Sequence, residues 1–227
     1  MRLLNIKTTI SSSTGTPNVP DYAILSHVWG SNEFLYSDIF KDEVSVPREK
    51  GVKVNRAAQF AREHGDTHLW IDTCCIDKSS SAEVSDTLNS MSDWYENATI
   101  CFAYLADVTS RDDLEGSERF KRGWTLMELL APKDVIFLDS DWNEIGARGS
   151  LANQLHKITN IDINILQKGQ SAACAQSAAT KFSWMAGRRC SRVEDVAYYL
   201  MGLFGVNMPI LYGEGSEKRS SVSKKNS

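Results

Sequence analysis

The sequence has no apolar run that approaches the roughly 18 residues needed to span a bilayer. Residues 1–7 lack the long apolar core of a signal peptide. There is also no arginine-rich face, and the formal net charge of −4 gives no general attraction to nucleic acid or to anionic membranes. We therefore expect a cytoplasmic protein with no membrane span and no nucleic-acid partner.

Cysteine pairs with the spacing of metal ligands are absent as well. The five cysteines lie at positions 74, 75, 101, 174 and 190, and none of them forms a CxxC pair. Adjacent Cys74 and Cys75 point to opposite faces of an extended segment, so they cannot bind one metal together. We expect a reducing compartment, structural thiols, no metal and no bound cofactor.

Several sequence motifs of known enzymes are missing. The chain has no Walker phosphate loop and no GxGxxG, so it does not bind phosphates through either motif. It also lacks the GxSxG motif that carries a nucleophilic serine. A thiol protease pair assembled from Cys74 or Cys75 with His27 has nothing in the sequence to fix its geometry.

What the sequence does contain is typical of a folded α/β protein. Its 227 residues are 42% apolar and 24% charged, which excludes disorder of the whole chain. Nearly continuous apolar runs, typical of strands covered on both faces, lie at residues 22–26, 68–72, 99–105 and 134–139. Helical patterns separate them at residues 48–64, 82–97 and 121–131. This alternation predicts a right-handed α/β winding with a parallel sheet.

The pattern changes after about residue 145, where we expect no further strands. Helices are predicted at 150–159, 173–186 and 191–204. We therefore divide the chain into an α/β core at 1–145, a helical annex at 146–213 and a polar, flexible tail at 214–227. Residues 11–19, rich in Ser and Thr, are expected to form a loop or an early hairpin turn.

Polar side chains follow the predicted strands at the point where each strand ends. Ligands of open α/β sheets bind beyond the carboxyl ends of the strands, so these positions predict a nucleotide cleft. Trp29 would stack on a planar ring, and Gly30 would let the backbone approach closely. The candidate binding residues of the strand ends are Ser26, His27, Trp29, Gly30, Asp72 and Cys74. Capping and turn chemistry is the alternative for Ser26 and His27, and a helix cap or a buried ion pair is the alternative for Asp72.

One segment, residues 122–132, combines an acid with an aromatic wall. Glu128 lies four residues after Trp124, so the two share one face of a helix and should meet. A carboxylate fixed against an indole beside a cleft is a candidate catalytic group. The alternative is that the segment is an ordinary buried helix and that Glu128 is solvated at its outer edge.

Four ordered blocks together resemble the signature blocks of the heterokaryon-incompatibility (HET) domain of filamentous fungi, over residues 1 to about 215. They are residues 22–30, 70–78, 120–132 and 192–215. The resemblance implies a cell-death effector of non-self recognition, a form of fungal innate immunity. It also implies self-association for activity and, as partner, a larger NACHT- or STAND-type receptor. The sequence departs from that architecture because it turns polar after Gly215 and stops.

A remoter similarity links the segment from Arg122 to Leu129 with the Trp-x-x-x-Glu helix of Toll/interleukin receptor (TIR) domains. That similarity implies a TIR-like, flavodoxin-like sheet and an NAD hydrolase in which Glu128 is the catalytic residue. Ser26, Trp29 and Asp72 would then line the pocket with Trp124. Arg122 would meet a phosphate, or else be a solvated surface arginine.

The chemistry is consistent with a single acid. Nicotinamide leaves NAD without needing a proton, so one carboxylate that steadies the positive charge on the ribose suffices. NAD or a related nucleotide is thus the expected substrate. Two other functions stay open at this point: a non-enzymatic signalling module that recruits death partners, and a metal-dependent nucleic-acid hydrolase using Asp72, Asp77 and Asp107.

Overall fold

The fold is centred on one seven-stranded sheet with the strand order β2-β1-β4-β3-β5-β6-β7. The computed structural model describes residues 1–7, 11–14, 19–39, 48–190 and 195–206. Four parallel strands form the middle of the sheet: β3 (Tyr22–His27), β4 (His68–Ile71), β5 (Ile100–Tyr104) and β6 (Val135–Leu138). These are the four predicted strands, and the expected flavodoxin-like α/β fold is confirmed.

The first of these parallel strands lies between the second and the third. Ala23 of β3 pairs with Leu69 of β4 on one side and with Ile100 of β5 on the other. The chain therefore winds first in one direction and then in the other, with the reversal between β3 and β5. In doubly wound sheets this switch point opens a crevice at the carboxyl ends of the strands, where ligands bind.

Three antiparallel strands, which flank the parallel centre of the sheet, were missed by the sequence analysis. β1 (Arg2–Asn5) and β2 (Ser11–Thr14) form an antiparallel hairpin, and β1 pairs with β4. The prediction of a loop or an early hairpin turn at residues 11–19 is therefore wrong for 11–14, which form the second strand of the hairpin, while 15–18 lie outside the described residues. At the other edge, β7 (Glu144–Ala147) pairs antiparallel with β6, so strands do not cease at residue 145. This strand also crosses the boundary that we placed between core and annex.

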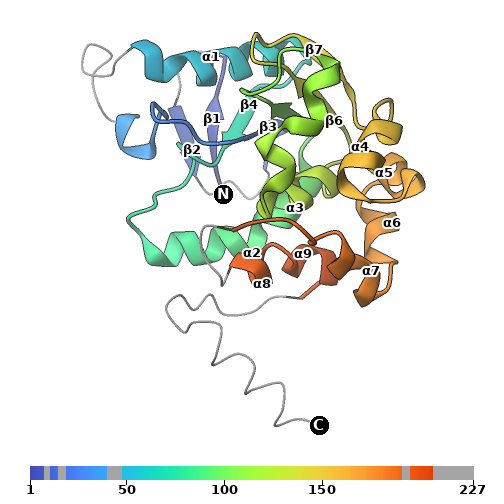
Figure 1. The fold of residues 1–227 in the computed structure, drawn as a ribbon. Helices are drawn as coiled ribbons and strands as arrows, with labels where there is room; N and C mark the ends of the chain where they lie inside the picture. Colours follow the sequence, from blue (N-terminus) through green and yellow to red (C-terminus); the bar gives the residue numbers. More distant parts are fainter. Residues whose placement is uncertain (8–10, 15–18, 40–47, 191–194, 207–227) are drawn as a thin grey trace.

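Helices cover both faces of the sheet, as Figure 1 shows with α1 on one side and α2 and α3 on the other. This follows from right-handed crossovers, because the chain moves from β3 to β4 in one direction and from β4 to β6 in the other, which places α1 on one face and α2 and α3 on the opposite face. The helices are α1 (Arg48–Glu63), α2 (Ser81–Asn97) and α3 (Trp124–Leu130). Residues 121–123 do not belong to the third helix as predicted. The short 3-10 turn η4 (Glu118–Lys121) precedes α3. Two further 3-10 turns are η1 (Tyr36–Asp38) and η3 (Arg111–Gly116).

The expected helical annex is present, in shorter pieces than predicted. Its helices are α4 (Ala152–Thr159), α5 (Ile163–Lys168), α6 (Gln170–Cys174), α7 (Ala178–Ser183), α8 (Asp195–Tyr198) and α9 (Met201–Phe204). The predicted helix at 173–186 is divided between α6 and α7, and the one at 191–204 between α8 and α9. The positive-φ residues Asn160 and Gly169 end α4 and α5. Residues 191–194 and the expected tail at 214–227 lie outside the described residues.

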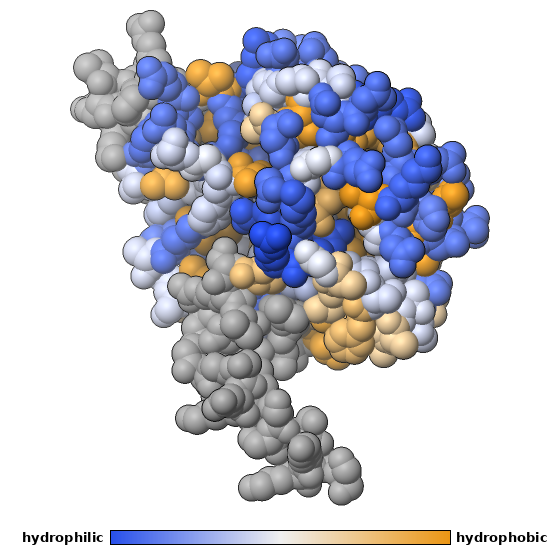
Figure 2. Space-filling model, viewed as in Figure 1, coloured by the Kyte–Doolittle hydropathy of each residue, from blue (hydrophilic) through white to orange (hydrophobic). Residues whose placement is uncertain are grey.

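Packing between the annex and the sheet layer joins the two regions. α9 packs on α2, and Trp124 of α3 meets Tyr199 edge to face. In the space-filling view of Figure 2, apolar surface gathers over the part of the annex that contains α7 and α9. Phe182 of α7 is 55% exposed there and packs on Phe204. Among the helices of the described residues, none has the length and the apolar character needed to cross a membrane.

Candidate active site

A pocket of about 490 Å³ opens between the carboxyl ends of β3 and β4 on one side and the helices α2 and α3 on the other. Its size is that of a site for a small molecule or a nucleotide. The residues that line it are His27, Trp29, Asp72, Ile76, Lys78, Val84, Thr87, Leu88, Met91, Arg122, Trp124, Thr125, Glu128 and Asp195. Six of the nine predicted site residues are among them: His27, Trp29, Asp72, Arg122, Trp124 and Glu128.

Glu128 lies on the inner side of α3 and is 8% exposed. Its Oε2 accepts a hydrogen bond from the hydroxyl of Ser26 on β3, and Nη1 of Arg119 lies 3.5 Å from the same oxygen. Trp124, one helical turn earlier, is half-buried and lines the same pocket. The alternative of a solvated glutamate on the outer edge of the helix is therefore wrong.

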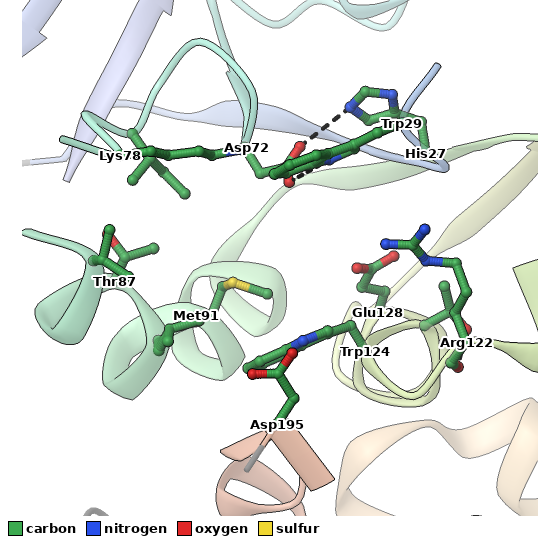
Figure 3. A pocket seen from close by; sticks show the side chains of 14 residues that line it. His27, Trp29, Asp72, Lys78, Thr87, Met91, Arg122, Trp124, Glu128 and Asp195 are labelled. Carbon is green, nitrogen blue, oxygen red and sulfur yellow. Dashed lines mark hydrogen bonds and ion pairs between the residues drawn. The ribbon is translucent and has the colours of Figure 1, made fainter. Parts of the chain in front are cut away.

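Asp72, directly after β4, is the second acid of the pocket, and both its oxygens accept hydrogen bonds. His27 Nε2 lies 3.1 Å from Oδ1, and the indole Nε1 of Trp29 donates to Oδ2 at 2.8 Å (Figure 3). Burial works to raise the pKa of Asp72, but these hydrogen bonds and the nearby charge of Lys78 outweigh it and hold the pKa below its usual value. Asp72 thus fixes the ring of Trp29.

His27 continues this network away from the pocket. Its Nδ1 lies 3.0 Å from Nζ of Lys53, and Lys53 also forms an ion pair with Glu33. Because an ammonium group only donates, Nδ1 must accept, which places the ring proton of a neutral His27 on Nε2, toward Asp72. The imidazole is therefore held at both nitrogens.

Two tryptophans lie on opposite sides of the pocket, as Figure 3 shows for Trp29 and Trp124. Lys78 places its ammonium 3.2 Å from the centre of the Trp29 ring, a cation–π contact. Lys78 is exposed overall, but protein atoms crowd its ammonium end, and this desolvation lowers its pKa. A planar group that entered between the indoles would find aromatic surface on both sides and the cations Lys78 and Arg122 nearby.

The remaining wall is apolar and comes from α2. It consists of Val84, Leu88 and Met91, with the buried Thr87 among them. Asp195, at the start of α8, closes the pocket from the annex side (Figure 3). The annex therefore contributes to the pocket itself.

The annex also anchors the segment that carries Glu128. Backbone hydrogen bonds join Gly123 N to Arg189 O at 2.9 Å and Arg189 N to Lys121 O at 2.6 Å. Arg188 donates to Arg122 O and to the hydroxyl of Thr125, at 2.9 and 3.0 Å. The first turn of α3 is thus held by residues more than 60 positions further along the chain.

Three predicted site residues do not line the pocket. Ser26 is 1% exposed and lies behind Glu128, to which it donates. Gly30 is exposed, and its backbone N–H donates to Glu33. Cys74 is completely buried because the chain turns back after Ile71, so its thiol packs into the core instead of following Asp72.

The thiol-protease alternative gains no support. Cys75 is also buried, and its Sγ contacts backbone groups of β4. A hydrogen bond with Cys75 and burial together raise the pKa of Cys74 well above its usual value, which disfavours the nucleophilic thiolate.

The acids proposed for metal chemistry lie apart. Asp77 accepts from Ser79, and Asp107 accepts from Ser117 and from the backbone of Glu118. Within the ranges that the structure describes, no three His, Cys, Asp or Glu side chains form a group suited to a metal ion.

Sequence reasoning missed eight of the fourteen lining residues, among them Lys78, Met91 and Asp195, and it also missed Arg119 beside the pocket. Lys78 follows the second strand end, so its position was available as a signal. Met91 belongs to the apolar stripe of α2 and is indistinguishable there from a core residue. Arg119 and Asp195 come from polar segments, and only their long-range contacts reveal them.

Comparison with known proteins gives one family and one relative. The family model described as "Heterokaryon incompatibility protein (HET)" matches residues 22–127, which include β3 to β5 and α3 up to Met127. The chain is similar to the vegetative incompatibility protein HET-E-1 of Podospora anserina, with 40% identity over 213 residues. That alignment covers 88% of this chain and 16% of the relative, so the chain spans about a sixth of the relative's length. No solved structure matches.

Proposed function

As the chain belongs to the heterokaryon incompatibility (HET) family, we propose that it is a cell-death effector domain of fungal non-self recognition that cleaves the nicotinamide–ribose bond of NAD. The observation that carries the enzymatic part is Glu128. It is a carboxylate held by a buried serine and arginine, and it borders a pocket with an indole on either side. The Trp124 to Glu128 spacing, which is similar to that of TIR domains, supports the same chemistry.

The reaction needs only the groups that this pocket offers. The bond between the ribose C1′ and the pyridinium nitrogen breaks, and its electron pair leaves with the nitrogen as neutral nicotinamide. The ribose is left with the positive charge of an oxocarbenium ion, which the Glu128 carboxylate stabilises. Water then adds to C1′ and loses one proton, which gives ADP-ribose.

The pocket also suits the remainder of the substrate. The indoles of Trp29 and Trp124 offer surfaces for a planar ring. Lys78 and Arg122 are cations at its border and would meet the phosphates. NAD is in this proposal a substrate and not a resident cofactor.

We place activation in self-association. The relative is far longer than this chain, which agrees with a domain that a larger receptor of the NACHT or STAND type brings together. On the chain itself, the exposed Phe182 of α7 offers apolar surface for such contacts.

The test is nicotinamide release from NAD by the purified protein, concentrated or fused to a clustering tag, beside the variant Glu128→Gln. Release by the wild type alone supports the proposal. Equal background from both proteins, with the wild type shown to be folded and clustered, overturns the enzymatic part.

The exposed apolar surface of α7 favours a second candidate, a non-enzymatic module that kills by recruiting partners. Under this hypothesis Glu128→Gln kills fungal cells as well as the wild type does, while Phe182→Ser does not. Loss of killing in Glu128→Gln at equal protein abundance decides against it.

A further inference from the structure

Arg119 is a buried arginine whose side chain reaches toward the acid of the proposed site. It belongs to the η4 turn before α3 and is 1% exposed. Its Nη1 donates a hydrogen bond to Ser26 Oγ, and Ser26 Oγ in turn donates to Oε2 of Glu128. We propose that Arg119 and Ser26 are positioning residues that hold one oxygen of Glu128 so that the other faces the substrate. This inference rests on the proposed function.

The direction of this hydrogen-bond relay is fixed by chemistry. A guanidinium group only donates, so Ser26 Oγ must accept from Arg119. The single hydroxyl proton of Ser26 is then left for the carboxylate. With Arg119 as donor and the carboxylate as acceptor, the Ser26 hydroxyl proton points toward Glu128, and the relay orients Glu128 in one way.

Both contacts fall on the same oxygen of Glu128. Oε2 accepts from Ser26 and lies 3.5 Å from Nη1 of Arg119. Among the residues that the structure describes, no hydrogen bond to Oε1 is present, although Glu128 lines the pocket. In Figure 3 the Glu128 carboxylate and the guanidinium of Arg122 point into the same part of the pocket. Oε1 is thus the oxygen available to a ligand.

Arg119 is a poor choice for stability alone. Its Nη2 is buried and has no hydrogen-bond partner among the described residues, and a buried donor left unsatisfied destabilises the folded state. Buried ion pairs often contribute less stability than apolar residues of similar volume. An unsatisfied buried donor in a native structure calls for an explanation, and a role in a functional site is one.

Arg119 also does not act on the substrate directly. It is absent from the pocket lining, whereas Arg122 belongs to it. The backbone oxygen of Arg119 accepts from the Thr125 hydroxyl at 2.6 Å, which ties the η4 turn to the first turn of α3. The turn and the helix therefore hold Arg119 and Glu128 in a fixed relation, and the influence of Arg119 on a reaction passes through Glu128.

The kinetic test compares Ser26→Ala with Ser26→Thr, which keeps the hydroxyl. We expect Ser26→Ala to lower kcat about 10- to 100-fold, the usual effect of removing a group that orients a reacting residue. KM for NAD should stay within about twofold because Ser26 does not line the pocket. Ser26→Thr should recover much of kcat. Thr159→Val, which removes a buried hydroxyl from α4, is the control and should keep full activity.

A double-mutant cycle tests whether the pair acts as one unit. If Arg119 works through Ser26 and Glu128, then Arg119→Met combined with Ser26→Ala should be no slower than the worse single variant. Effects that multiply would show independent roles and would contradict the relay. Thermal unfolding of every variant identifies any that fails to fold, and Ser26→Thr keeps the test decisive in that case.

An infrared measurement separates this inference from the proposed function. The difference spectrum between the wild type and Glu128→Gln isolates the carboxylate bands of Glu128. These bands should shift in Ser26→Ala and return in Ser26→Thr, whether or not NAD is cleaved. Unchanged bands, or an unchanged kcat in an active Ser26→Ala enzyme, would overturn the positioning role. Absence of NAD cleavage by the wild type would instead count against the proposed function alone.

Discussion

Glu128 and Asp72 both face the pocket, but the protein surrounds them differently. The donors around Glu128 converge on one oxygen, from Ser26 and Arg119. Asp72 accepts a hydrogen bond on each oxygen, from His27 and Trp29. A carboxylate with both oxygens occupied is suited to hold its neighbours, and one with an unoccupied oxygen is suited to act on a ligand. Proximity to a pocket therefore does not by itself identify the reacting acid.

The largest effect should come from shortening the acid of α3. Glu128→Asp keeps the charge but withdraws the carboxylate by one methylene, away from both Ser26 and the substrate. We expect kcat for nicotinamide release to fall about 100-fold or more, because electrostatic stabilisation depends on placement. Glu118→Asp in the adjacent η4 turn, where the side chain is 62% exposed, should keep wild-type kcat. Full activity of Glu128→Asp would remove the distinction between the two acids.

A second variant disturbs the helix that carries Glu128 and leaves Asp72 in place. A Cβ at Gly123 would overlap Cys190 Sγ and the ring of Tyr199. We expect Gly123→Ala to lower the free energy of unfolding by about 1–3 kcal/mol, the usual cost of overpacking. Gly149→Ala, where a Cβ meets nothing within 4 Å, should change it by less than about 0.5 kcal/mol. Urea unfolding measures both, and equal stability of the two variants would show that the annex does not pack tightly on α3.

Asp72→Asn should affect binding more than catalysis. The amide keeps an oxygen for one donor but loses the charge that orients His27 and Trp29. We expect KM for NAD to rise about tenfold, a cost of about 1.4 kcal/mol in binding, with kcat within about twofold. Steady-state kinetics measures both parameters. A large fall in kcat at unchanged KM would assign Asp72 a chemical role.

The smallest effect concerns pH. The folded pKa of Asp72 lies below its usual value of about 3.9, so ionised Asp72 stabilises the fold at pH values above that range. This contribution is lost as the pH falls through the folded pKa. The difference in melting temperature between the wild type and Asp72→Asn should therefore be largest near pH 6–7 and shrink below about pH 4. A difference that grows toward acid pH would contradict the assigned direction.

The sequence predicts the centre of this fold better than its edges. β3 to β6 are buried on both faces and appear as continuous apolar runs, which is why they were recognised. β2 consists of Ser and Thr residues, and its strand character comes from pairing with β1. β7 has an exposed first residue followed by three half-buried ones, so no apolar alternation marks it.

The site residues, too, fall into those that the sequence predicts and those that it does not. Trp29, Asp72 and Glu128 lie at strand ends or at a helical spacing that the sequence displays, and all three line the pocket. The prediction that Cys74 belongs to the site was wrong because a tight turn after Ile71 directs its thiol into the core. Strand periodicity does not predict such a turn. Arg119 was missed because its partner Ser26 lies 93 residues earlier in the chain. Contacts across such distances follow from tertiary packing.

The most direct test of the account is to measure NAD binding and nicotinamide release on the same clustered preparations of the wild type and Glu128→Gln. The account predicts that Glu128→Gln binds uncleaved NAD with nearly wild-type affinity and releases nicotinamide at background rate, while the wild type turns NAD over. Nicotinamide release by folded Glu128→Gln at the wild-type rate would contradict the account, because Glu128 would then not be the residue that acts on the bond.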